Sequence, residues 1–210
     1  MPLLGPQRTA DLYRCFLSDI LTRACRAEAD VTVAVADAED VDAVGAFVSR
    51  FCPGARVTVQ SDGDLGARMA DAFQEALARG CAPATLIGTD SPDLPADRIE
   101  QAFRLSQTYD IVLGPCVDGG YYLIAMGQVV PGIFEDLEWS GANVLTETLR
   151  RAEEEGATSA LLEPWYDVDT PRDLITLQQR LRALHLAGRE VPCQHTWEFL
   201  RDIDLGKEGA

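Results

Sequence analysis

The most constraining feature of this 210-residue chain is a regular alternation of segments with helical and strand periodicity. Apolar residues recur every three or four positions in the helical segments, whereas short runs of β-branched and other apolar residues mark the strands. The helical segments are 7–27, 40–51, a stretch that begins after the turn at 61–64, 96–105, 143–155 and 171–186, and the strand-like segments are 31–36, 56–60, 86–90, 111–116, 121–126 and 160–162. This order predicts an α/β protein, built as a three-layer α/β/α sandwich with a mostly parallel central sheet.

One pair of strands departs from the alternation. Segments 111–116 and 121–126 are separated only by 117–120, a loop with two glycines, which predicts a β-hairpin. We expect one domain over residues 1–203, because 210 residues with 47% hydrophobic content are enough for one sizeable core. Residues 204–210 are expected to form a frayed tail.

Composition excludes several classes of function. The formal net charge is −16 and no basic block offsets it, which argues against binding to nucleic acid or to an anionic membrane. An anionic substrate would therefore need a metal. No apolar run approaches the roughly 18 residues of a membrane span, and the N-terminus lacks a signal-peptide pattern, so we expect a cytoplasmic protein.

The reactive side chains are equally restrictive. The chain has seventeen arginines but a single lysine, Lys207, and it contains neither a lysine-bearing phosphate loop nor a dinucleotide fingerprint. Its six cysteines form no Cys-x-x-Cys pair, and its two histidines are far in sequence from the acidic motifs. Lysine chemistry, a zinc site and a Ser-His-Asp triad are therefore all disfavoured.

The stretch from Thr85 to Pro95 is the first motif, in which an apolar run stops at two aspartates that enclose a proline. A strand here would carry Asp90 to the carboxyl edge of the sheet, where open α/β folds bind ligands. Asp90 and Asp93 offer hard oxygen ligands for Mg²⁺ or Mn²⁺. The alternative is a strand-to-helix loop whose polar residues only cap the next helix.

The second motif is Gly114-Pro-Cys-Val-Asp-Gly-Gly-Tyr-Tyr-Leu-Ile124. A turn that needs positive φ angles would explain Gly119 and Gly120 by itself. The functional interpretation is that a backbone without side chains lets a ligand approach, with Asp118 at the lip and Tyr121 or Tyr122 in contact with a sugar or base.

The third motif runs from Trp165 to Leu174, and part of it is structural. Thr170, Pro171 and Asp173 make a helix start of the capping-box type. That leaves Asp167 and Asp169 at the end of a predicted strand. Carboxylates brought to one sheet edge from different strands would bind a divalent cation, whereas each alone would be a solvated loop residue.

Taken together, these motifs resemble the nucleotide-diphospho-sugar transferases of the GT-A fold, over about residues 3–177. The most similar branch is the bacterial radical-SAM/selenodomain-associated transferases. The motifs that carry the resemblance are Gln60-x-x-Gly63-Asp64-Leu-Gly-x-Arg68-Met69, Thr89-Asp-Ser-Pro-Asp-Leu-Pro95, Gly114-Pro-x-x-Asp-Gly-Gly-Tyr-Tyr-Leu-Ile124 and Asp167-Val-Asp-Thr-Pro-x-Asp-Leu174.

The resemblance implies a Mg²⁺ or Mn²⁺ site in which Asp90 and Asp169 match metal-binding aspartates, with Asp167 beside them. We expect Asp118 to orient an acceptor or to act as general base. The residues expected to bind substrate or nucleotide are Gln60, Gly63, Asp64, Arg68, Gly119, Gly120 and Tyr121. For Arg68 the alternative is a plain surface arginine on a helix.

Members of that branch usually begin with a strand and a glycine-containing loop that ends in Lys-Thr-Arg-Leu, whereas this chain begins with Met1-Pro-Leu-Leu-Gly-Pro6. We therefore expect a GT-A-like domain without its first strand. Three functions stay open: glycosyl transfer from a nucleotide-diphospho-sugar, which we favour, nucleotidyl transfer to a phosphorylated small molecule, and a non-catalytic binding domain. In the last case unpaired strand edges would favour pairing with another chain, for example in a homodimer.

Overall fold

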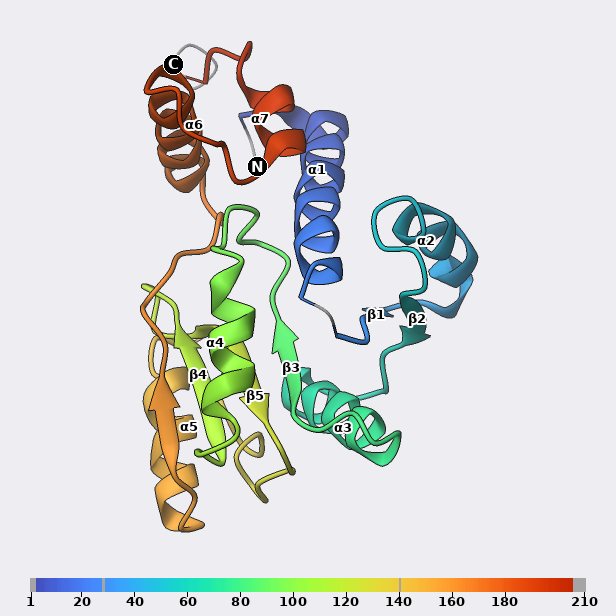
Figure 1. Ribbon diagram of the computed structural model, residues 1–210, viewed down its shortest axis with the longest axis vertical. Helices are drawn as coiled ribbons and strands as arrows, with labels where there is room; N and C mark the ends of the chain where they lie inside the picture. Colours follow the sequence, from blue (N-terminus) through green and yellow to red (C-terminus); the bar gives the residue numbers. More distant parts are fainter. Residues whose placement is uncertain (1–2, 28, 140, 206–210) are drawn as a thin grey trace.

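The computed structural model describes residues 3–27, 29–139 and 141–205 (Figure 1). Its helices are α1 (Gly5–Cys25), α2 (Val41–Val48), α3 (Leu65–Ala78), α4 (Asp97–Leu105), α5 (Val144–Glu154), α6 (Pro171–Leu186) and α7 (Gln194–Leu200), with a short 3-10 helix η1 (Ala38–Asp40). Its strands are β1 (Thr32–Val35), β2 (Arg56–Val59), β3 (Ala84–Ile87), β4 (Ile111–Pro115), β5 (Tyr121–Met126) and β6 (Ser159–Leu161). The mixed α/β class and the order of elements are confirmed, and α7 is the helix that the sequence pattern did not predict.

The strands of the described residues form two sheets. Strands β3, β5, β4 and β6 lie side by side in that order, and β1 pairs with β2 in a separate parallel sheet. β5 is antiparallel to both of its neighbours, and its pairing with β4 follows from the loop 117–120, which is too short to join parallel strands. The other three strands, β3, β4 and β6, run in one direction, so only the predicted hairpin strand departs from the parallel arrangement.

Helices cover both faces of the four-stranded sheet, which gives the expected three layers (Figure 1). The two faces follow from the alternation of side chains along each strand. On one face, α3 and α5 contribute Phe73 and Ala152 to a core with Ile111, Leu113, Ile124 and Met126. On the other face, α4 contributes Ile99 and Ala102 to a core with Val112, Leu123 and Ala125.

Helices α1, α6 and α7 form a helical unit beside the carboxyl ends of β3, β4 and β6 (Figure 1). Leu12 and Phe16 of α1 pack in its core against Leu177 and Leu181 of α6. The core of this unit is distinct from the cores on the two faces of the sheet. The helical unit therefore lies next to the edge of the sheet at which these three strands end.

The buried carboxylate of Asp19 ties α7 to α1. Its Oδ1 accepts a hydrogen bond from the backbone N–H of His195 at 3.0 Å, and its Oδ2 accepts from the N–H and hydroxyl of Thr196 at 2.8 and 2.7 Å. These donors lie in the first turn of α7, where the backbone N–H groups have no partner within the helix. Such a contact over 176 positions of sequence leaves no local pattern, which explains why α7 was not predicted.

The β1–β2 sheet has a smaller core of its own, to which Leu21 of α1 and Val48 of α2 contribute. Among the described residues, β1 pairs only with β2, and β3 pairs only with β5. Each of these two strands therefore keeps one edge without a partner strand in the part of the chain that the structure describes.

No helix of the described ranges combines the length and the apolar character that crossing a membrane requires.

Candidate functional site

Three loops meet at the carboxyl ends of β3, β4 and β6, and they contain the three acidic motifs. The segment after β6 joins the other two. The Val168 N–H donates to the Asp90 carbonyl oxygen at 2.9 Å, and the Trp165 N–H donates to the Pro115 carbonyl oxygen at 2.9 Å. Cys116 and Trp165 form a parallel bridge that extends this contact. The aspartates far apart in sequence are thus brought to one sheet edge, as predicted.

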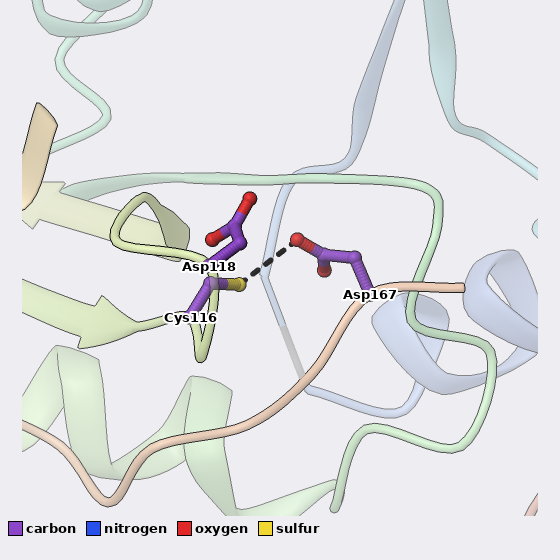
Figure 2. Close-up of side chains that lie close together, drawn as sticks. All are labelled: Cys116, Asp118 and Asp167. Carbon is purple, nitrogen blue, oxygen red and sulfur yellow. Dashed lines mark hydrogen bonds between the residues drawn. The ribbon is translucent and has the colours of Figure 1, made fainter. Parts of the chain in front are cut away.

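The carboxylate of Asp167 is fixed by two protein donors. The Ser91 hydroxyl lies 2.7 Å from Oδ1, and the Cys116 thiol donates to Oδ2 at 2.9 Å (Figure 2). Burial and the negative charge of Asp167 raise the pKa of the Cys116 thiol, so this side chain stays a donor. One ligand atom each from Cys116, Asp118 and Asp167 lie within 4.8 Å of one another, a spacing that a single metal ion can span.

Asp90 and Asp169 differ from Asp167 in their surroundings. Among the described residues, neither carboxylate accepts a hydrogen bond or pairs with an arginine. Burial raises the pKa of Asp90, and the charges of Asp169 and Asp167 raise it further. Burial and the charges of Asp167 and Asp118 likewise raise the pKa of Asp169. We call Asp90, Asp118, Asp167 and Asp169 the acidic cluster.

Asp118 sits on the hairpin turn between β4 and β5, and it is exposed. Its Oδ1 accepts a hydrogen bond from the Gly120 N–H at 2.9 Å, which orients the carboxylate. Gly119 has a φ of +99°, and a Cβ there would lie 1.9 Å from the Ala142 carbonyl oxygen. The turn thus requires Gly119 on structural grounds, and the ligand-contact role of Gly119 and Gly120 stays a prediction.

Asp93 takes no part in the acidic cluster, although the sequence offered it as an oxygen ligand beside Asp90. Its side chain is 0% exposed and pairs with Arg180 at 2.6 Å. The Tyr166 hydroxyl donates to it at 2.6 Å. With its oxygens engaged by protein donors, Asp93 holds the loop in place rather than facing a ligand.

Gln60, Gly63 and Asp64, three of the residues predicted to bind substrate or nucleotide, lie between β2 and α3, and Arg68 lies in the first turn of α3. Arg68 donates to the Gln60 side-chain oxygen and to the Gly63 carbonyl oxygen, each at 3.1 Å. The Asp64 side chain accepts from the Ala67 N–H at 2.9 Å and caps α3. These contacts organise the segment, whereas its role in binding stays a prediction.

Tyr121 and Tyr122 point to opposite faces of the sheet. The Tyr121 ring packs edge-on against Trp139, with 6.4 Å between the ring centroids, and burial raises the pKa of its hydroxyl. The Tyr122 hydroxyl donates to the Glu163 carbonyl oxygen at 3.1 Å. Both rings therefore take part in packing, and the predicted contact of Tyr121 with a sugar or base stays a prediction.

The sequence interpretation missed three residues that contact the site. Ser91 and Cys116 lie inside the quoted motifs, but their bonds to Asp167 depend on how the loops meet. Tyr13 of α1, which is 43% exposed, places its hydroxyl 2.7 Å from that of Thr89, next to Asp90. No local pattern in α1 marks Tyr13, because Thr89 lies 76 positions away.

The fold is that of the nucleotide-diphospho-sugar transferases. A solved structure from Desulfovibrio desulfuricans G20, described as a "putative nucleotide-diphospho-sugar transferase", matches with a TM-score of 0.84 and 30% sequence identity. The match covers 95% of this chain and 85% of that chain. The resemblance read from the motifs is thereby confirmed at the level of fold and family, while the association with radical-SAM proteins stays a prediction.

Residues 20–141 match the family described as "Uncharacterized protein conserved in bacteria (DUF2064)". The chain belongs to this family. No curated protein matches it.

Proposed function

We propose that this protein is a metal-dependent transferase that uses a nucleotide-activated donor and transfers a glycosyl group from a nucleotide-diphospho-sugar. The observation that carries the proposal is the acidic cluster at the carboxyl edge of the sheet. Two of its members, Asp90 and Asp169, have raised pKa values because burial and neighbouring carboxylates disfavour their charge. Groups perturbed in this way, in a ligand-binding position of the fold, are typical of functional sites.

The donor atoms of the cluster suit Mg²⁺ or Mn²⁺, which prefer carboxylate oxygens. Asp90 and Asp169 would hold the ion, and Asp167 would complete the set with the orientation that Ser91 and Cys116 give it. When bound, a divalent cation supplies charge neutralisation for a diphosphate and a template for its orientation. This fits a chain whose net charge of −16 would otherwise repel a nucleotide.

The remaining tasks fall to the protein's own side chains. Arg68, which Gln60 holds in place, is the candidate contact for phosphate or base at the end of β2. Gly63 and Asp64 shape the same segment, and the backbone of Gly119 and Gly120 at the hairpin would contact the ligand.

Asp118 is the candidate catalytic residue. Its exposed carboxylate is oriented by the Gly120 N–H and would accept the proton of the acceptor hydroxyl as that oxygen attacks the donor sugar. Catalysis would then rest on positioning and on charge stabilisation.

Thermal unfolding tests this proposal. We expect Mn²⁺ together with one nucleoside diphosphate or nucleotide sugar to stabilise the protein, by about 2.7 kcal/mol at a ligand concentration of 100 Kd. Asp90→Ala should abolish the shift, whereas Asp71→Ala, which removes an exposed carboxylate on α3, should retain it. No shift with any nucleotide in the presence of Mn²⁺ would contradict the proposal.

The reaction products separate the two transfer chemistries. Release of a nucleoside diphosphate from a nucleotide sugar would mark glycosyl transfer. Release of pyrophosphate from a nucleoside triphosphate, with a phosphorylated small molecule as acceptor, would mark nucleotidyl transfer instead. Binding without either product would favour the non-catalytic binding domain.

A further inference from the structure

Asp93 belongs to a second charged group, three positions after Asp90 in the sequence, and its surroundings are the reverse of those of Asp90. Its side chain is 0% exposed, and Arg180 of α6, 37% exposed, pairs with its Oδ2 at 2.6 Å. The Tyr166 hydroxyl donates to the same oxygen at 2.6 Å, and the Trp165 indole N–H lies 3.4 Å from Oδ1. We call Asp93, Trp165, Tyr166 and Arg180 the Asp93 latch.

The latch is held together by stacking as well as by charge. The Arg180 guanidinium lies over the Trp165 ring, 4.6 Å from its centroid, and 5.9 Å from that of Tyr166. The two rings stack on each other with 5.5 Å between centroids. A guanidinium keeps its charge and offers donors in a fixed plane, so Arg180 can serve the buried carboxylate and the aromatic face together.

The place of the latch in the chain gives it a consequence for the site. Asp93 follows Asp90 by three positions, and Tyr166 immediately precedes Asp167. The latch therefore joins the two loops that carry Asp90 and Asp169. The Val168 N–H also donates to the Asp90 carbonyl oxygen at 2.9 Å. The two loops are therefore connected both by the latch and by this backbone hydrogen bond.

The acidic cluster needs such a tie. Its carboxylates repel one another, and this repulsion acts to separate the loops whenever no cation is bound. A metal site binds tightly when its ligands are already held in place by their outer partners.

We infer that the Asp93 latch is a positioning device for the metal site: Arg180 and Tyr166, acting through Asp93, hold the loop of Asp90 next to the loop of Asp167 and Asp169, so that their carboxylates can bind one divalent cation. The inference rests on the proposed function. It assigns a role in the site to Arg180 of α6, which lies 87 positions from Asp93 in the sequence. In the described structure, Arg180 donates to none of the carboxylates of the acidic cluster.

Mn²⁺ binding to the full chain, measured from the electron paramagnetic resonance signal of free Mn²⁺, tests the inference without an activity assay. Tyr166→Phe keeps the ring but removes one donor to Asp93, and Arg180→Gln removes the charge. We expect each to weaken Mn²⁺ binding about tenfold. Arg180→Lys keeps the charge without the planar donors and should lie between Arg180→Gln and the unaltered protein.

Asp19→Asn provides the matched control. Asp19 is another buried carboxylate with several protein donors, but its hydrogen-bond partners in the described part of the chain, His195 and Thr196, belong to α7 and not to the three loops. We expect this variant to lower the unfolding temperature, as Arg180→Gln does, while its Mn²⁺ affinity stays unchanged.

The possible outcomes distinguish failure of the latch inference from failure of the metal site itself. If the unaltered protein binds Mn²⁺, Asp90→Ala abolishes binding, and the latch variants bind as tightly as the unaltered protein, the latch is only structural and the inference fails alone. If Asp19→Asn weakens Mn²⁺ binding as much as the latch variants do, general loss of stability explains the effect and the inference also fails. If the unaltered protein binds no Mn²⁺, the metal site and the latch inference fail together.

Discussion

Asp90 and Asp93 lie three positions apart in one loop, yet their carboxylates have opposite electrostatic surroundings. Asp93 is completely buried and paired with Arg180. Asp90 is partly buried, and the nearest charges that affect it, those of Asp169 and Asp167, are of the same sign. In the first arrangement opposite charges compensate each other, whereas in the second the carboxylates repel one another until a cation or a proton binds. Burial of an acid therefore says little about its role until its partners are known.

We expect the largest difference between Asp90 and the Asp93 latch in metal binding. Asp90→Asn removes a proposed ligand, so we expect Mn²⁺ affinity to fall by at least about 100-fold, beyond the tenfold effect of the latch variants. Isothermal titration calorimetry measures this difference directly. Equal effects of Asp90→Asn and Tyr166→Phe on Mn²⁺ affinity would contradict the distinction between Asp90 as a metal ligand and Tyr166 as a positioning residue.

For the free energy of unfolding, we expect the larger loss at the Asp93 latch rather than at Asp90. Arg180→Gln leaves the Asp93 charge buried without its cation, and because Arg180 is 37% exposed we expect a loss of about 2 kcal/mol, less than for a fully buried pair. Urea unfolding at neutral pH with a chelator present checks this value. A loss below about 0.5 kcal/mol would mean that Tyr166 and Trp165 satisfy Asp93 without Arg180.

Asp90→Asn should act in the opposite direction on the protein without metal. The pKa of Asp90 is raised in the folded state, so the folded protein binds more protons than the unfolded chain between the ordinary carboxyl pKa and the raised one. Stability therefore falls as the pH rises through that window. Replacing the ionised group with a neutral amide should stabilise the protein by about 1 kcal/mol at pH 7.

The pH dependence supplies the control for that prediction. Below the ordinary carboxyl pKa, Asp90 is protonated in both states, so Asp90→Asn and the unaltered protein should have the same stability contribution from this position. Urea unfolding at several pH values, with a chelator present, should show the advantage of the variant appearing as the pH rises. An advantage that is the same at every pH would mean that charge repulsion is not its source.

The sequence predicted the elements well because their signals are local. Periodicity located α1, the β4–β5 hairpin and α6, and the capping box at Thr170 and Asp173 is present at the start of α6. The division into two sheets was not predicted, because strand partners are chosen by contacts between distant segments.

The same local signals predicted where the candidate site residues lie, whereas their roles stay predictions. Position at the ends of strands was enough to group Asp90, Asp167 and Asp169. It could not separate Asp93 from them, because the difference arises from Arg180, a contact over 87 positions. The roles of Ser91 and Cys116 were hidden for the same reason.

We expect the smallest effect at Cys116, a neutral donor to the acidic cluster that the change of a single atom modifies. Its thiol donates to Asp167 Oδ2 at 2.9 Å and shares that carboxylate with Ser91. Cys116→Ala removes the donor but leaves the Ser91 bond, so Asp167 keeps part of its orientation. We expect Mn²⁺ affinity to fall only about threefold, less than the tenfold effect of a full outer partner.

Cys116→Ser separates orientation from packing at this position. A hydroxyl donates a stronger hydrogen bond than a thiol, so the serine variant should bind Mn²⁺ at least as tightly as the unaltered protein, while both variants lose some packing of the buried sulfur. The same Mn²⁺ titration decides between the two causes. Equal weakening in the alanine and serine variants would show that the sulfur itself, as a packing group or as a ligand, matters more than its bond to Asp167. A threefold loss confined to alanine would place Cys116 with Arg180 and Tyr166, among the residues that hold the acids rather than those that hold the metal.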